Sequence, residues 1–237
     1  MQTANSFWNQ FEARTATYDL LQHSFYKAWT AGELTGEDLR AYAAEYWHHV
    51  SAFPTYLSAL HAQLPDGPMR RTVLENLADE EGIGSPDGRP HSDLWMDFLR
   101  GMGGDTAAQT LQPETQQLIA TFRSLMHAEP AAALAALYAY ESRVPAIARE
   151  KAAGLTEHYG ADAAATRYFT LHQTADVYHA KVWQDLINAE LAAHPEAAEA
   201  ALQAAETAAK ALWNTLDGIE SERRTRNGIT ELSCSMN

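Results

Sequence analysis

Apolar residues recur every three to four positions along most of the chain, and runs that alternate between apolar and polar residues are scarce. Such spacing is that of an α-helix with one buried face, and the frequent Ala, Leu, Glu and Gln favour helices. The pattern therefore predicts an all-α protein, a bundle of helices. The segments that we expect to be helical are 5–22, 23–29, 35–63, 69–81, 91–98, 113–127, 130–154, 162–193 and 195–218.

Local signals set several of these boundaries. Thr35, followed three positions later by Asp38, is typical of a helix N-terminus. Three other segments begin with a residue that suits the first turn of a helix, namely Pro113, Pro130 and Pro195.

The chain shows no internal repeat, so residues 1–219 are expected to form a single helical-bundle domain. From Glu220 on, Ser, Arg, Asn and Gly follow one another without helical periodicity. This change of pattern predicts a flexible C-terminal tail over residues 220–237.

Composition narrows the classes of function. The 237 residues carry a formal net charge of −14, whereas nucleic acids and anionic membranes bind clustered Lys and Arg, so we expect neither as a partner. Cys234 is the only cysteine and cannot form a disulfide within the chain, which fits a cytoplasmic location. We find no signal peptide after Met1, and no stretch approaches the roughly 20 apolar residues that span a bilayer.

The first candidate for chemistry is a stripe of three polar residues, His172, Asp176 and His179. Spacings of four and three residues place all three side chains on one face of a helix. Two imidazoles and a carboxylate suit iron or manganese. The alternative for such a stripe is a solvated polar helix face.

Three further residues fit the same chemistry. Glu80 ends one predicted helix and His91 begins the next, while Glu141 lies in an otherwise apolar and aromatic helix. A carboxylate there needs a partner, which can be a cation, a hydrogen-bond network or an arginine such as Arg143 or Arg149. With the stripe, these residues make three carboxylates and three imidazoles, the ligand balance of a non-haem di-iron site in a helical bundle. The Glu-x-x-His pair of ferritin-like proteins is missing, so the bundle is of another kind.

Several long strings closely resemble the Chlamydia protein associating with death domains and its bacterial relatives, which are haem-oxygenase-like di-metal oxidases. The resemblance spans about residues 20 to 190 and is carried by HSFYKAW from His23, GEL from Gly32, AFPTYLSALH from Ala52, NLADEEG from Asn76, HSDLW from His91, ALYAYESRVPAIAREKAAGLTEHYG from Ala136 and YFTLHQTADVYHA from Tyr168.

The resemblance implies a seven-helix bundle of the haem-oxygenase-like (TenA/PqqC-like) type and suggests a homodimer. It also implies two bound metal ions, iron with iron or iron with manganese, which react with O2 and an external reductant. The implied metal ligands are Glu80, His91, Glu141, His172, Asp176 and His179.

Relatives in this family supply p-aminobenzoate for folate synthesis and are thought to cut the aromatic ring from one of their own tyrosines. By position, Tyr26 matches the sacrificed tyrosine and Lys151 matches the lysine thought to give the amino nitrogen, while Tyr42 and Tyr140 match tyrosines near the metals. A lysine that donates nitrogen must be neutral, so we expect Lys151 to be buried close to Tyr26. Without the resemblance, these tyrosines would be read as ordinary core residues.

Two features depart from the family. Eleven positions separate Glu80 from His91, where the relatives have a short loop, so Asp79 and Glu81 compete with Glu80 as the ligand, although the helical register favours Glu80. The C-terminal tail has a single Cys where the chlamydial protein is Cys-rich, so death-domain binding is not transferred.

Other functions are compatible with parts of the pattern. A di-metal oxidase could act on an external small molecule, and a helical bundle without catalysis could be an interaction module. Within the same fold, a thiaminase needs a cysteine nucleophile, for which Cys234 is a poor candidate. A pyrroloquinoline quinone synthase would leave the ligand set unexplained, and a haem oxygenase would need an axial histidine, for which His23 is the nearest candidate.

Overall fold

The computed structural model describes residues 2–108 and 110–229, and the described residues form helices and no strands. The all-α prediction is therefore confirmed. The α-helices are α1 (Gln2–Thr15), α2 (Ser24–Thr30), α3 (Gly36–Gln63), α4 (Pro68–Glu80), α5 (His91–Gly101), α6 (Pro113–Leu125), α7 (Pro130–Glu141), α8 (Val144–Tyr159), α9 (Ala163–Ala193) and α10 (Ala198–Arg226). Short 3-10 helices cover Ala16–Tyr18, Leu20–Gln22 and Pro195–Ala197.

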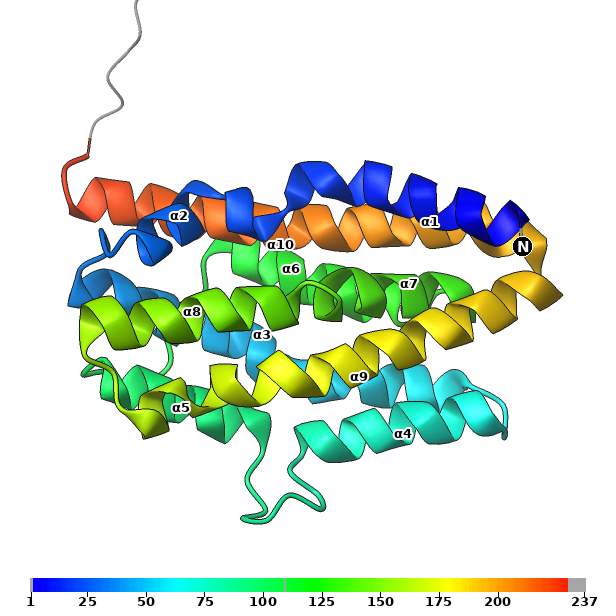
Figure 1. Ribbon diagram of the computed structural model, residues 1–237, viewed down its shortest axis with the longest axis horizontal. Coiled ribbons are helices and arrows are strands. Elements are labelled where there is room, and N and C mark those ends of the chain that lie inside the picture. Colours follow the sequence, from blue (N-terminus) through cyan, green and yellow to red (C-terminus); the bar gives the residue numbers. More distant parts are fainter. Residues whose placement is uncertain (1, 109, 230–237) are drawn as a thin grey trace, which may run out of the picture.

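The helices lie roughly along one long axis (Figure 1). Helix α10 packs against α1, α6 and α7, and α3 packs against α4, α5 and α6. The 31-residue helix α9 contacts α4, α5, α7 and α8, so it connects the two sides of the bundle. The loop between α4 and α5 projects outward below α9, and the start of α5 faces α9 (Figure 1).

The helix starts follow the sequence signals. At the start of α3, the Thr35 hydroxyl accepts a hydrogen bond from the backbone N–H of Asp38 at 3.1 Å, and the Asp38 carboxylate accepts one from the Thr35 N–H at 2.9 Å. This reciprocal pair satisfies two donors that a helix end leaves free. At the start of α9, Asp162 Oδ1 accepts from the N–H of Ala165 at 2.9 Å.

The segment 130–154 is two helices rather than the one that we predicted. Helix α7 ends at Glu141 and α8 begins at Val144, with Pro145 in its first turn. A proline nitrogen carries no hydrogen, so Pro145 cannot donate to the carbonyl of Glu141 and the helix is interrupted there. The described residues form ten α-helices instead of seven, although the bundle itself is as expected.

The C-terminal helix extends further than predicted, because α10 continues to Arg226. Glu220 is buried and accepts hydrogen bonds from Arg223 and Arg224, and Arg226 donates to Asp38 at the start of α3 at 2.8 Å. The prediction of a flexible tail is thus wrong for residues 220–226. Residues 230–237, including Cys234, lie outside the described part.

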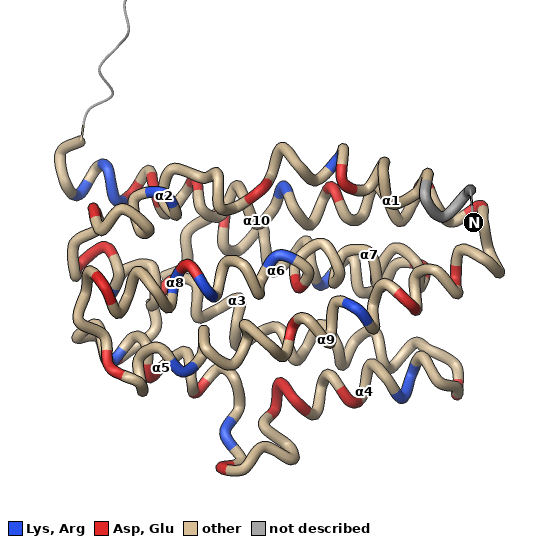
Figure 2. Tube along the Cα trace, viewed as in Figure 1, with Lys and Arg blue, Asp and Glu red and all other residues tan. Residues whose placement is uncertain are grey.

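The charged positions are scattered over the helices and do not form a basic stripe in the part of the chain that is described (Figure 2). No helix within the described ranges is long and apolar enough to cross a membrane.

Candidate metal centre and adjoining tyrosine chamber

The polar stripe of α9 faces the interior. His172, Asp176 and His179 are each at most 3% exposed, and they lie on the same helix face as the buried Phe169 and Trp183. The helical spacing therefore predicted their common orientation correctly, and the alternative of a solvated face is excluded.

The first candidate ligand group consists of Glu80, His91 and His172, each of which offers one ligand atom within 4.8 Å of the others. Glu80 Oε2 lies 3.0 Å from His91 Nδ1, across the gap between the end of α4 and the start of α5. His172 Nδ1 donates to the carbonyl oxygen of Tyr168 at 2.7 Å. This contact fixes the ring and leaves the lone pair of His172 on Nε2, the arrangement typical of metal-binding histidines.

The second group consists of Glu141, Asp176 and His179, again with ligand atoms within 4.8 Å of one another. His179 Nδ1 lies 3.2 Å from Asp176 Oδ1 and 3.5 Å from Glu141 Oε2. Glu141 reaches this position because it ends α7, which packs against α9. The structure thus brings all six predicted ligands into two adjacent buried groups.

Among the three acidic residues at the end of α4, Glu80 is the buried one, whereas the side chain of Asp79 is 57% exposed and Glu81 is exposed. Asp79 Oδ2 lies 3.3 Å from His179 Nε2, so Asp79 contacts the second group from its outer side. The loop of residues 82–90 separates Glu80 from His91 in sequence without separating their side chains.

Sequence reasoning considered Asp79 only as a rival of Glu80, and it missed another neighbour of the second group, Asn76. Asn76 Nδ2 lies 3.5 Å from Glu141 Oε2. Asn76 precedes Glu80 by four residues, so the helical register could have placed it on the same face of α4.

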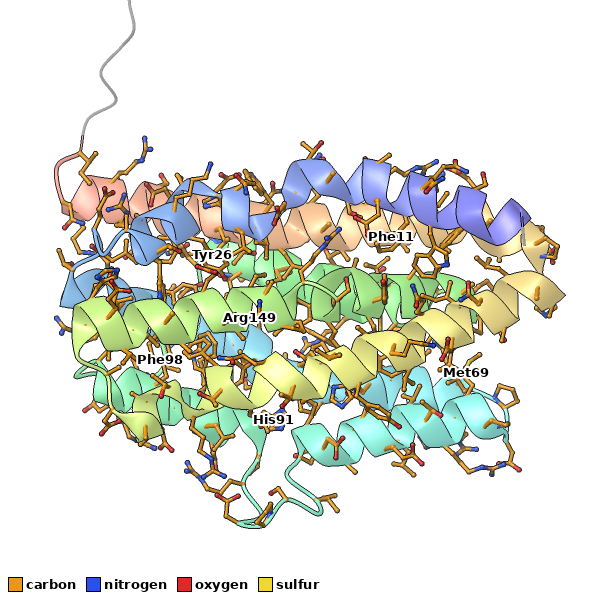
Figure 3. The ribbon with its side chains drawn as sticks, viewed as in Figure 1. Phe11, Tyr26, Met69, His91, Phe98 and Arg149 are labelled. Carbon is orange, nitrogen blue, oxygen red and sulfur yellow. The ribbon has the colours of Figure 1, made fainter. Side chains whose placement is uncertain are left out.

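The chemistry of the six residues fits a cation. Glu141 Oε1 is buried and makes no hydrogen bond, and His91 Nδ1 has the Glu80 carboxylate as its partner. The arginines considered as partners lie elsewhere, since Arg143 pairs with Glu12 at 2.6 Å and Arg149 is exposed on α8 (Figure 3). Buried carboxylates whose partners are imidazoles and one neutral amide need compensating positive charge.

The pKa shifts in the second group also indicate a need for positive charge. Burial raises the pKa of Glu141 to about 8. Burial alone would lower the pKa of His179, but the hydrogen bond to Asp176 and the charge of Glu141 raise that pKa to about 10. Both shifts favour the protonated forms, which indicates that this cluster favours added positive charge.

A chamber lined by aromatic residues adjoins the ligand groups. The hydroxyl groups of Tyr26 and Tyr42 lie 3.1 Å apart, and Lys151 Nζ donates a hydrogen bond to the Tyr42 hydroxyl. Lys151 Nζ lies 4.3 Å from the centroid of the Tyr26 ring. Tyr26 is 3% and Lys151 5% exposed, so the expected burial of the lysine beside this tyrosine is confirmed. Burial lowers the pKa of Lys151 well below its usual range.

Two small cavities lie beside these residues, one at the chamber and one at the ligands. One, of about 30 Å³, is lined by Tyr26, Tyr46 and Lys151, and the other, of about 10 Å³, by Glu80, Glu141 and His172, among others. Tyr140 and Tyr168 line both cavities. Tyr140 was predicted near the metals, whereas Tyr46 and Tyr168 were not, because buried aromatic residues at helical spacing are ordinary in a bundle core.

The alternative of an axial haem ligand is not supported at His23. His23 Nδ1 accepts a hydrogen bond from the N–H of Phe25 at 3.1 Å, and its Nε2 lies 3.1 Å from Asp217. Both ring nitrogens are therefore engaged at the start of α2.

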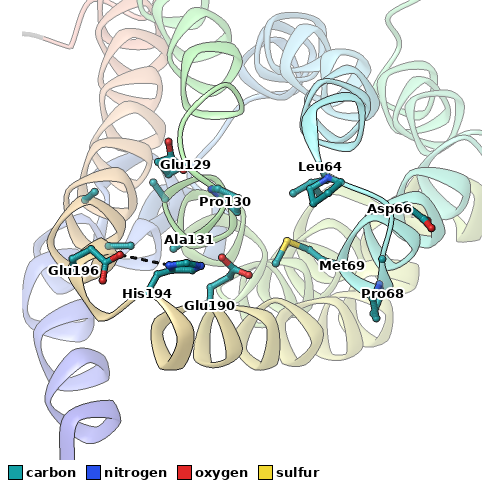
Figure 4. A pocket seen from close by; sticks show the side chains of 15 residues that line it. Leu64, Asp66, Pro68, Met69, Glu129, Pro130, Ala131, Glu190, His194 and Glu196 are labelled. Carbon is teal, nitrogen blue, oxygen red and sulfur yellow. Dashed lines mark ion pairs between the residues drawn. The ribbon is translucent and has the colours of Figure 1, made fainter.

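The largest cavity described lies away from these residues. It has a volume of about 740 Å³ and is formed where the ends of α3 and α9 meet the starts of α4 and α7 (Figure 4). Its lining includes Leu64, Met69, Pro130, Glu190 and His194 and none of the predicted site residues. Met69 and Tyr26 lie toward opposite ends of the bundle (Figure 3).

Comparison with known proteins agrees with this geometry. The chain is 42% identical to the 4-aminobenzoate synthase of Nitrosomonas europaea over 229 residues, which cover 91% of each chain. It is 40% identical to the 4-aminobenzoate synthase of Chlamydia pneumoniae over 84% of this chain and 88% of that protein. A solved TenA homologue from Pseudomonas syringae has the same fold, with a TM-score of 0.78 at 17% identity over 92% of this chain and 93% of that one.

A family model described as iron-containing redox enzyme matches residues 40–213, a range that includes all six candidate ligands. The protein belongs to this haem-oxygenase-like family of iron-containing redox enzymes.

Proposed function

We propose that the protein is an oxygen-dependent di-metal oxidase that forms p-aminobenzoate, with Tyr26 as the source of the ring and Lys151 as the source of the amino nitrogen. p-Aminobenzoate is the same compound as the 4-aminobenzoate in the names of the relatives above. Its formation would serve folate biosynthesis in the cytoplasm. A homodimer is the proposed assembly.

The observation that carries this proposal is the placement of the Lys151 amine over the ring of Tyr26, 4.3 Å from the centroid, in a chamber next to the two ligand groups. Burying a lysine is costly. No carboxylate accounts for it here, since its hydrogen bond goes to the neutral hydroxyl of Tyr42. The placement makes chemical sense if the amine reacts with the aromatic side chain beside it.

The atoms of the product match a tyrosine side chain. p-Aminobenzoate contains an aromatic ring and one carboxyl carbon, and a tyrosine side chain contains the same ring and one Cβ. Its formation from Tyr26 therefore requires that the Cα–Cβ bond breaks and that Cβ is oxidised to a carboxyl group, with O2 as the oxidant. The Lys151 nitrogen must also replace the phenolic oxygen, which leaves as water, and the Cε–Nζ bond of Lys151 must break to release it. Residue 26 would be left without a side chain.

Six residues would hold the metals, namely Glu80, His91, Glu141, His172, Asp176 and His179. Bound iron, paired with iron or manganese, would supply the power to reduce O2 and oxidise a phenol, with electrons from an external reductant.

The chain's own residues prepare the reacting groups. Burial lowers the pKa of Lys151 and so favours the neutral amine, whose nitrogen has a free electron pair. The hydroxyl of Tyr42 contacts both the Tyr26 hydroxyl and Lys151 Nζ, and so orients the phenol and the amine together. The surrounding aromatic and aliphatic side chains exclude water from the Tyr26 ring.

The test is anaerobic loading with iron, with and without manganese, followed by O2 and reductant, and mass spectrometry of the small molecules and of the intact protein. We expect release of p-aminobenzoate and loss of the Tyr26 side chain from the same molecules. Protein without metal serves as the control. Release of product from protein that keeps Tyr26 would move the substrate outside the chain, and metal binding without any product would overturn the proposal.

A further inference from the structure

The walls of the Tyr26 chamber are held by contacts that do not involve the Tyr26 side chain. On both sides of Tyr26 in α2, Phe25 and Trp29 are at most 1% exposed. Trp29 Nε1 donates to the carbonyl oxygen of Lys151 at 3.3 Å, which joins α2 to α8. An added Cβ at Gly154 would lie 2.9 Å from the Trp29 ring, so the two helices pack closely at this point. Removal of the Tyr26 side chain would leave these contacts in place.

Different residues of the chamber would contact the hydroxyl and the ring of a phenol. The Tyr42 hydroxyl, 3.1 Å from that of Tyr26, provides a hydrogen-bonding partner at one end. The remaining described lining is mainly apolar and includes Ile147 and Phe169, with Lys151 as its one basic residue. About 30 Å³ beside the Tyr26 ring is already empty, so a molecule slightly larger than the side chain has room.

We propose that this chamber becomes a binding site for small para-substituted phenols, such as p-cresol, once residue 26 lacks its aromatic side chain. The inference rests on the proposed function for how such a state arises naturally, because forming p-aminobenzoate would remove that side chain. The site itself follows from the packing around Tyr26.

A phenol matches the vacated space better than a hydrocarbon or water. A hydrocarbon would bury the hydroxyl of Tyr42 without its second partner, which costs binding energy. Water would satisfy that hydroxyl but would leave the apolar walls hydrated, whereas buried apolar cavities bind aromatic molecules. A phenol supplies both the hydroxyl and the ring.

The test uses a Tyr26→Ala variant prepared without metal and titrated with p-cresol, with toluene as the matched ligand that lacks the hydroxyl. Binding is measured by isothermal calorimetry and by the rise in melting temperature. We expect the variant to bind p-cresol at least about tenfold more tightly than toluene, the value of one good hydrogen bond. Wild-type protein, whose chamber is filled, should bind neither.

The double variant Tyr26→Ala/Tyr42→Phe removes the hydrogen-bonding partner and should lose the preference for p-cresol. If Tyr26→Ala does not fold, Tyr26→Val, which keeps more of the packing, is titrated in the same way. A folded variant that does not bind p-cresol, or that binds toluene equally tightly, would overturn the inference. Because no metal, O2 or turnover is involved, this result is independent of whether p-aminobenzoate is formed.

Discussion

Lys151 Nζ lies 4.3 Å from the centroid of the Tyr26 ring, and the two side chains share one hydrogen-bonding partner, the hydroxyl of Tyr42. Lys151 comes from α8 and Tyr26 from α2, so the packing of these two helices brings them together. A charged ammonium in this environment would be stabilised only by hydroxyl groups and aromatic faces. Burial therefore favours the neutral amine.

Replacing Lys151 by methionine should change how stability depends on pH. The pKa of Lys151 is lowered in the folded protein, so between that pKa and the ordinary value of 10.5 the unfolded chain binds a proton that the folded chain does not. Wild-type stability therefore falls as the pH is lowered through this window. The free energy of unfolding of Lys151→Met, relative to wild type, should rise by about 1.4 kcal/mol per pH unit as the pH falls.

Urea denaturation between pH 7 and 10 measures this difference. The matched control is Lys181→Met, because the Lys181 side chain is 62% exposed and pairs with Asp185 at the surface. Its unfolding curve should shift in parallel with wild type at each pH. An equal pH slope for Lys151→Met and wild type would mean that Lys151 is charged in the folded protein.

Replacing Tyr26 by phenylalanine should abolish p-aminobenzoate release while leaving the fold intact. The change removes only the hydroxyl that lies 3.1 Å from that of Tyr42, so the cost in stability should be about 1 kcal/mol. Metal content should be unchanged, because Tyr26 is not a candidate ligand. Tyr56→Phe is the control, since Tyr56 is fully buried but lines neither of the two small cavities. Product from Tyr26→Phe at the wild-type level would exclude Tyr26 as the substrate.

The polar stripe of α9 could be predicted from the sequence because its signal is local. His172, Asp176 and His179 share one helix, so the periodicity alone places them on one face. Glu141 was conspicuous as a carboxylate among apolar residues. By contrast, nothing in the sequence distinguishes Tyr168 from other core aromatic residues, although it stands between the two cavities.

One error in the fold came from a contact between residues that are remote in sequence. Helix α10 continues past Gly218. Its C-terminal end is held by Arg226 and Asn227, which donate hydrogen bonds to Asp38 at the start of α3. A pattern read within a short window cannot contain such a pairing. The break before Pro145 was a different kind of error, since a proline in a long apolar helix is compatible with either a kink or a new start.

Removing one imidazole from each ligand group should reduce metal binding. We expect His172→Ala and His179→Ala each to bind iron more weakly, by at least about tenfold, and to hold fewer than two metals per chain after gel filtration. Elemental analysis after anaerobic loading measures the content. His194→Ala, at a 62% exposed histidine, should match wild type. Full metal content in both His172→Ala and His179→Ala would show that the metals bind elsewhere.

In the loop between Glu80 and His91, replacing glycine by alanine should be more harmful at Gly82 than at Gly84. Both glycines have positive φ angles, 72° and 90°, so alanine at either position costs roughly 1–2 kcal/mol in backbone strain. At Gly82, an added Cβ would also lie 2.4 Å from the backbone of Arg89, whereas nothing lies within 4 Å of one at Gly84.

Gly82→Ala should therefore push residues 89 and 90 away and displace the start of α5, where His91 faces Glu80 at 3.0 Å. We expect it to lose more stability than Gly84→Ala in urea denaturation and to bind iron more weakly, while Gly84→Ala keeps wild-type iron affinity. Equal iron affinities in the two variants would mean that α5 is positioned by its packing against α3 and α9, and that the loop only connects the two ligands.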